Sequence, residues 1–160
     1  MNRIEVLISE IENSVSGDPW HGWPVKKILD GITEQQAFSK PLPNAHSIVE
    51  LTLHIWAWTA ETTSRLKGNP PGDPIAGDWP DAEQYKSEGW EEIKSKLYSS
   101  TEELILTLKN FPEFKLDEIV GPLREPSLGT GFSFEATVHG VAQHNAYHSG
   151  QIALLKKYFH

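Results

Sequence analysis

Apolar residues recur every three or four positions in four segments of the chain, which is the spacing of one face of an α-helix. The first segment has this spacing at Ile4, Leu7, Ile8 and Ile11. Asn2, with Glu5 three residues later, matches a capping box, so we predict a helix that starts there and ends before Gly17.

The second and the last of these segments also begin with residues that cap helices. Ser47 and Glu50 form a second capping-box pattern, and helical spacing continues from there to Gly68. Its periodic positions are Ile48, Leu51, Ile55, Trp58 and Thr62. Ser133 can cap a final helix that runs to a basic last turn at Lys157, where positive charge is favourable.

The third segment, 81–110, is the longest and has a charged background. Its apolar positions are Tyr85, Trp90, Ile93, Leu97, Leu104 and Leu108. This spacing predicts one long helix, in which Gly89 is a weak point.

The connections between these helices are rich in proline and glycine. The stretch 20–38 is predicted to be a long, partly helical crossover, with Pro24 at a first helical position and Gly31 at a stop. The stretch 68–80 contains four prolines and three glycines and should be irregular. For 115–131 we expect turns, with a short β-hairpin as the alternative.

Four substantial helices with little strand signal predict an all-α fold. The expected architecture is an antiparallel four-helix bundle with long, partly helical crossover connections. The 160 residues are enough for one hydrophobic core, so we expect a single domain over 1–160.

Composition and charge exclude several classes of partner. The formal charge is −8, from 14 basic and 22 acidic residues without long blocks of one sign, so we expect neither nucleic-acid nor membrane binding. The chain has no cysteine, so a metal would have to use nitrogen and oxygen ligands. The N-terminal segment lacks the apolar region of a signal peptide, and a cytoplasmic location is the expectation.

Two histidines in the last helix have the spacing of a chelating pair. His144 and His148 are four residues apart, so they lie one turn apart on nearly the same helix face. Imidazole suits zinc, nickel, iron or copper. The same spacing also occurs in surface or core pairs that bind nothing, and spacing alone leaves both interpretations open.

His54 is the natural third ligand, because it lies in an apolar part of the second helix. An unpaired buried imidazole is costly, so it needs either a metal or a hydrogen-bond partner. Three imidazoles from two helices would hold a metal and leave coordination positions open.

Other polar residues have both a structural and a functional interpretation. Glu50 is a weak candidate for a base near the metal, against its role in the cap. Gln151 is a second weak catalytic candidate, and a hydrogen bond that fixes a histidine tautomer is an equally good interpretation. His139 lies about 140° around the helix from His144 and should be structural. The C-terminal His160 should be exposed.

Two further histidines and five tryptophans lie in segments that should surround the metal. His21 and His46 could line the mouth of a pocket, although neither has chelate spacing. Core packing is the expected role of most of the tryptophans, with one or two of them lining a substrate pocket. They are Trp20, Trp23, Trp56, Trp58 and Trp79.

Several of these segments together resemble the DinB superfamily of bacterial helical-bundle proteins. They are PWHG (19–22), HSIVELTLHIWAW (46–58), DWP (78–80) and VHGVAQHNAYHSGQIALLKK (138–157). The resemblance covers almost the full chain and implies that His54, His144 and His148 are metal ligands. It is also in keeping with a homodimer.

The resemblance implies a class of proteins and leaves the reaction open, because one fold supports several chemistries. Some members of the superfamily transfer thiols such as bacillithiol or glutathione, some are mycothiol-dependent isomerases, and many are described as metal-dependent hydrolases. We therefore expect a divalent transition metal, zinc or nickel before iron or manganese, and a small-molecule substrate such as a low-molecular-weight thiol. Thiol S-transfer is slightly favoured over hydrolysis, and a non-enzymatic metal- or ligand-binding bundle is the competing class.

Overall fold

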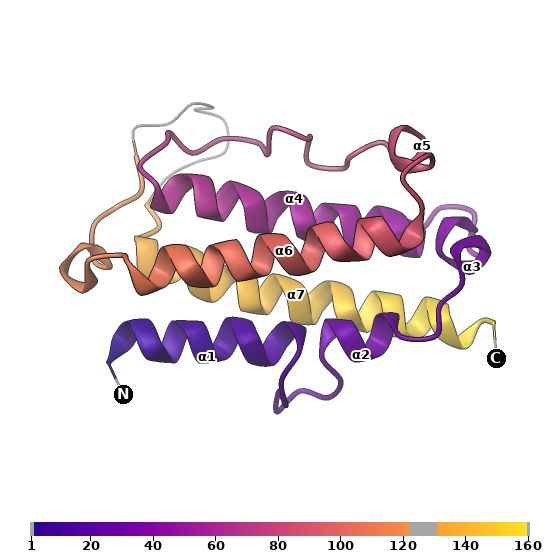
Figure 1. The fold of residues 1–160 in the computed structure, drawn as a ribbon, viewed down its shortest axis with the longest axis horizontal. Helices are drawn as coiled ribbons and strands as arrows, with labels where there is room; N and C mark the ends of the chain where they lie inside the picture. Colours follow the sequence, from indigo (N-terminus) through magenta and orange to yellow (C-terminus); the bar gives the residue numbers. More distant parts are fainter. Residues whose placement is uncertain (1, 122–130, 160) are drawn as a thin grey trace.

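The computed structural model describes residues 2–121 and 131–159, and every regular element in them is a helix (Figure 1). The elements are α1 (Arg3–Val15), α2 (Val25–Leu29), α3 (Glu34–Phe38), α4 (Ile48–Leu66), α5 (Ala82–Tyr85), α6 (Trp90–Lys109), the 3₁₀ helix η1 (Glu113–Lys115) and α7 (Phe134–Lys157). The prediction of an all-helical fold is confirmed for this part of the chain.

Four long helices lie side by side, and each packs against two of the others (Figure 1). Helix α4 contacts α6 and α7, and α1 contacts the same two helices. The apolar faces meet in two clusters of buried side chains. One cluster includes Leu53, Ile93 and Leu97, and the other includes Leu7 and Leu104, so two apolar clusters fix the helices relative to one another.

The predicted helix starts are confirmed at the caps. Ser47 and Glu50 form a reciprocal capping box at the start of α4, as Asn2 and Glu5 do at the start of α1. The Ser133 side chain accepts a hydrogen bond from the backbone of α7. Because these bonds satisfy free N–H groups of the first turn, local chemistry decides where the three helices begin.

The segment predicted as one helix over 81–110 is divided into α5 and α6, so that prediction is wrong at the break. Gly89 has a φ of 86°, which ends the helical path. The Trp90 backbone N–H donates to Glu34 Oε2 at 3.1 Å, and its indole N–H donates to the Ile32 carbonyl at 2.9 Å. These tertiary bonds favour a new helix start at Trp90 over continuation through Gly89.

The crossover between α1 and α4 contains two short helices, α2 and α3, as expected. Pro24 lies at the N-cap of α2 rather than at its first helical position, and Gly31 between the two helices has a φ of 72°. The expected turns of 115–131 lie partly outside the described residues, as does His160. Within the described part, an isolated bridge joins Ile119 to Ser133, and no strand forms.

The irregular connection 67–81 runs along α4 from its C-terminal end to α5 (Figure 1). It is held by the Glu61 carboxylate, which accepts from the Gly72 N–H at 3.0 Å and from Arg65 Nε at 3.0 Å. Arg65 Nη2 in turn donates to the Gly72 carbonyl. These bonds hold the first half of the connection against the C-terminal part of α4.

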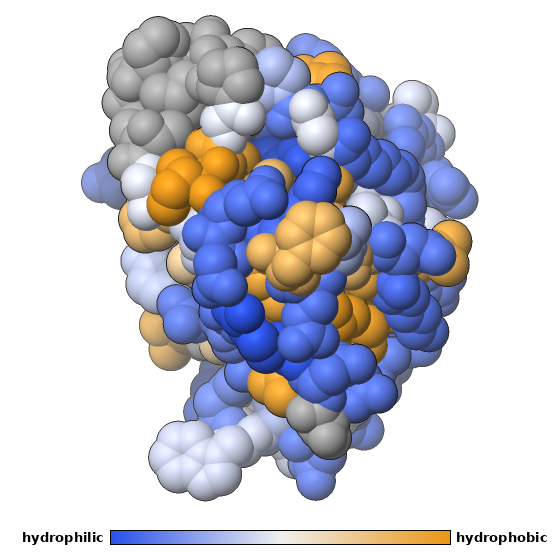
Figure 2. All heavy atoms as spheres, turned by 90° about the vertical axis from the view of Figure 1, so that its left-hand side faces the viewer, coloured by the Kyte–Doolittle hydropathy of each residue, from blue (hydrophilic) through white to orange (hydrophobic). Residues whose placement is uncertain are grey.

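The end of the molecule at which α1 begins is mainly hydrophilic, with separate apolar areas (Figure 2). None of the described helices has the length and apolar character needed to cross a lipid bilayer.

Candidate metal centre

The three histidines meet where α4 packs against α7. His54 comes from α4, and His144 and His148 come from successive turns of α7. One ligand nitrogen from each ring lies within 4.8 Å of the other two, and Nε2 of His54 is 2.9 Å from Nε2 of His144. Within the described residues, this group of three imidazoles is the one with the spacing to hold a metal ion.

Hydrogen bonds at the far side of two rings fix which nitrogen faces the centre. His54 Nδ1 donates to the backbone carbonyl of Asp78 at 2.5 Å, so its Nε2 carries the free lone pair. His148 Nδ1 donates to Gln151 Oε1 at 3.1 Å, which leaves its Nε2 as the lone-pair nitrogen. Such outer hydrogen bonds orient histidine ligands in metal sites.

Trp79 holds the plane of the His54 ring. Its ring lies parallel to that of His54, with centroids 3.9 Å apart, and also parallel to that of His46 at 3.5 Å. The neighbouring Asp78 side chain accepts a hydrogen bond from the indole N–H of Trp58 at 2.7 Å. The connection thus supplies both a hydrogen-bond acceptor and a stacking surface for a histidine on α4.

Burial favours the neutral form of all three imidazoles. Burial, together with the proximity of His148 and His54, lowers the pKa of His144 to about 3. Burial likewise lowers the pKa of His54 and of His148, although the hydrogen bonds to Asp78 and Gln151 act in the opposite direction. Neutral imidazole is the form that binds a metal, so the three nitrogens are available as ligands near neutral pH.

A groove of about 530 Å³ opens onto the three histidines between α4 and α7. Its other lining residues are mainly aromatic or small: Trp58, Thr62, Arg65, Asp78, Trp79, Phe132, Ala136, Thr137, Gly140, Val141 and Tyr147. This volume is within the range of small-molecule sites. The imidazoles are therefore reachable by a ligand of moderate size.

The two weak catalytic candidates differ in their distance from the centre. Glu50 bonds to Ser47 in the capping box and pairs with Lys40 at 2.7 Å, away from the groove. Partial burial would raise the pKa of Glu50, but the contacts with Lys40 and Ser47 outweigh it and lower the pKa. Gln151 contacts His148 directly, in the arrangement of a residue that fixes a tautomer.

The remaining histidines lie outside the group of three. His139 points to α1, where its Nδ1 is 2.6 Å from Glu10 Oε2, in agreement with a structural role. His21 lines a different hollow, between α1 and α7. His46 stacks on Trp79 and is not among the described residues that line the groove.

Two of the five tryptophans line the groove, and the other three do not. Trp58 and Trp79 are the lining pair. Trp56 packs against the core, whereas Trp20 and Trp23 are largely exposed. Sequence reasoning anticipated one or two lining tryptophans but missed the part played by the Asp78 carbonyl, because a backbone contact from an irregular segment has no sequence period.

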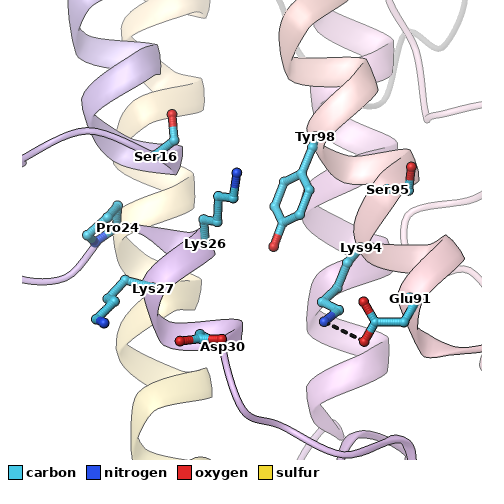
Figure 3. A pocket seen from close by; sticks show the side chains of 9 residues that line it. All are labelled: Ser16, Pro24, Lys26, Lys27, Asp30, Glu91, Lys94, Ser95 and Tyr98. Atoms are coloured by element: carbon cyan, nitrogen blue, oxygen red, sulfur yellow. Dashed lines mark ion pairs between the residues drawn. The ribbon is translucent and has the colours of Figure 1, made fainter.

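A second hollow, of about 560 Å³, lies between α2 and α6 (Figure 3). It is lined by Lys26, Lys27 and Lys94, and the Tyr98 side chain projects into it from α6. The Lys94 ammonium pairs with Glu91 at 2.8 Å. Ammonium groups are not metal ligands at neutral pH, so the α4–α7 groove is the candidate centre.

The donor set of the centre fits a divalent transition metal. Neutral imidazoles suit such ions, and three protein ligands leave positions for an exogenous group, whereas structural zinc sites are usually closed by four. His54, His144 and His148 would be the residues that hold the ion.

Comparison with known proteins gives one match. The family model described as the DinB superfamily matches residues 25–152. No curated protein and no solved structure matches the chain.

Proposed function

The chain belongs to the DinB superfamily, and from this premise we propose that it is a metal-dependent enzyme built on a four-helix bundle. His54, His144 and His148 hold one divalent transition metal, zinc or nickel, at the base of the groove. The observation that carries the proposal is the convergence of three imidazoles, with ligand nitrogens within 4.8 Å of one another, at the end of an accessible groove.

The protein's own residues prepare the centre for a ligand. The Asp78 carbonyl and the Gln151 side-chain oxygen accept hydrogen bonds from the outer nitrogens of His54 and His148, so both rings present a lone pair inward. Trp79 covers one ring face and limits water access to His54. The bound ion would supply Lewis acidity, which lowers the pKa of a thiol or water that approaches its open side.

The favoured reaction is thiol S-transfer. The thiol loses its proton to solvent, its sulfur forms a bond to an electrophilic carbon, and the leaving group departs with the electron pair of the broken bond. The groove would hold the electrophile beside the histidines. Family membership supports this choice over hydrolysis, in which water replaces the thiol.

Metal analysis of the purified protein tests the ligand assignment. We expect about one equivalent of metal in the parent protein and a large loss in His54→Ala and His148→Ala. His139→Ala is the matched control, because His139 lies on the same helix but pairs with Glu10 instead. A metal-free parent protein that cannot be reconstituted, or variants with full metal content, would refute the site.

Turnover of the reconstituted protein tests the reaction. The metal-loaded and metal-free forms are assayed with bacillithiol, mycothiol or glutathione and a chromogenic aryl halide, and separately with a nitrophenyl ester without thiol. Metal- and thiol-dependent loss of halide supports S-transfer, and ester cleavage alone supports hydrolysis. Equal rates with and without metal would contradict a metal-dependent enzyme.

A further inference from the structure

The groove extends well beyond the three histidines. Along α4 it is lined from His54 to Arg65, which are 11 residues apart, or about 16 Å at the helical rise. Along α7 the lining continues from His148 back to Ala136. A ligand that fills this groove has one end at the imidazoles and the other end several helical turns away.

The walls of this extension are apolar and carry little net charge. Phe132 and Tyr147, 69% and 67% exposed, both turn large aromatic surface toward the groove. Among the lining residues that the structure describes, Arg65 is the one with a cationic side chain, and it is already paired with the buried carboxylate of Glu61 at 3.0 Å. Within the described part of the lining, a multiply charged or phosphorylated compound would find no unpaired cation, whereas a neutral apolar chain would bury surface against the aromatic rings.

Gly140 keeps the middle of the groove open. It lies inside α7, where glycine costs roughly 1 kcal/mol relative to alanine. A Cβ at this position would meet no atom within 4 Å, so close helix packing does not explain the glycine. Because Gly140 lines the groove, any larger side chain there would project into the space available to a ligand.

We propose that the groove binds the extended, uncharged apolar part of a substrate whose reacting group lies at the three histidines, and that Gly140 determines the length accepted. This inference rests on the proposed function, because it places the reacting group at the metal centre. It adds the substrate class, a molecule with an extended, uncharged apolar chain.

Straight-chain hydroxamic acids are suitable probes, because their head group chelates metals and their tail length can be varied. Dissociation constants of acetohydroxamate and octanohydroxamate are measured on the metal-loaded parent protein. We expect about twofold tighter binding per added methylene, or roughly 60-fold over six, since one side of the groove is open to solvent. In Gly140→Leu the dissociation constants of acetohydroxamate and octanohydroxamate should differ by less than about threefold, because the leucine side chain would occupy the groove.

Gly150→Leu is the matched control for this substitution. Gly150 also lies inside α7 with no atom within 4 Å of an added Cβ, but it is exposed and outside the groove. The Gly150→Leu variant should keep the full gain in affinity from acetohydroxamate to octanohydroxamate. Gly140→Ala should give an intermediate gain, and it remains informative if the leucine variant does not fold.

The outcomes separate this inference from the proposed function. If acetohydroxamate does not bind the metal-loaded protein, the open metal centre itself is refuted. If acetohydroxamate binds but longer chains bind no more tightly, the apolar groove is refuted and the metal centre stands. If Gly140→Leu and Gly150→Leu keep equal gains, Gly140 does not determine the accepted length.

Discussion

The buried carboxylate of Glu61 offers a quantitative test of how the irregular connection is held. Its side chain is 1% exposed and accepts hydrogen bonds from Arg65 and from the backbone of Gly72. The connection 67–81, which this carboxylate holds at Gly72, carries Asp78 and Trp79 to His54. Loss of this carboxylate should therefore weaken both the fold and the candidate site.

The perturbation is Glu61→Gln, which keeps the size of the side chain and removes its charge. Breaking a buried ion pair typically costs 3–5 kcal/mol, because the remaining charge is left without a partner. Arg65 is 17% exposed, and the glutamine oxygen can still accept one hydrogen bond, so we expect a loss of about 2 to 3 kcal/mol. Urea unfolding of the metal-free protein measures this loss. The dependence of the free energy of unfolding on urea concentration should be the same in both proteins.

Glu103→Gln is the control for this experiment. Glu103 also pairs with a cation, Lys67, but the two side chains are 56% and 48% exposed. Such a surface pair is worth less than about 1 kcal/mol. If both variants lose the same free energy of unfolding, the argument that the Glu61 pair holds the connection is wrong.

Three further predictions concern the histidines and one backbone turn. The free energy of unfolding of the metal-free protein should fall by about 1 to 2 kcal/mol between about pH 7 and pH 5. In this range His144, whose pKa is lowered to about 3 mainly by burial, is neutral in the folded protein and becomes protonated in the unfolded chain. The contribution is present above about pH 6.5 and is lost as the pH falls toward 3, so urea midpoints that do not change with pH would contradict it. Gln151→Leu should weaken metal binding about 10- to 100-fold in chelator competition, since His148 loses its orienting acceptor, and unchanged affinity would exclude that role. Gly89→Ala should cost about 2 kcal/mol in thermal unfolding, because φ 86° and ψ 159° strain any residue with a Cβ, and an unchanged melting temperature would show that the turn can relax.

Features decided by neighbouring residues could be predicted from the sequence. The helix starts at Asn2, Ser47 and Ser133 were predicted because capping depends on groups within three residues. The break at Gly89 was missed because Glu34, more than 50 residues away, supplies the bond that fixes the new start. Helical spacing alone favoured a continuous helix.

The candidate site could likewise be predicted only in part from the sequence. Spacing placed His144 and His148 on one face of a helix, but their meeting with His54 depends on how α4 packs against α7. The acceptor on Asp78 is a backbone carbonyl in an irregular segment, where no periodic pattern indicates its direction. The groove likewise results from packing between two helices and has no signature in either one.

The histidines also join segments that are far apart along the chain. His54 and His144 are 90 residues apart, so an ion bound to both would act as a reversible cross-link between α4 and α7. An ion that binds only the folded state adds roughly 2.7 kcal/mol of stability at 100 times its dissociation constant. The lifetime of the protein against proteolysis would then follow the supply of metal in its surroundings, so metal starvation would remove protein as well as activity.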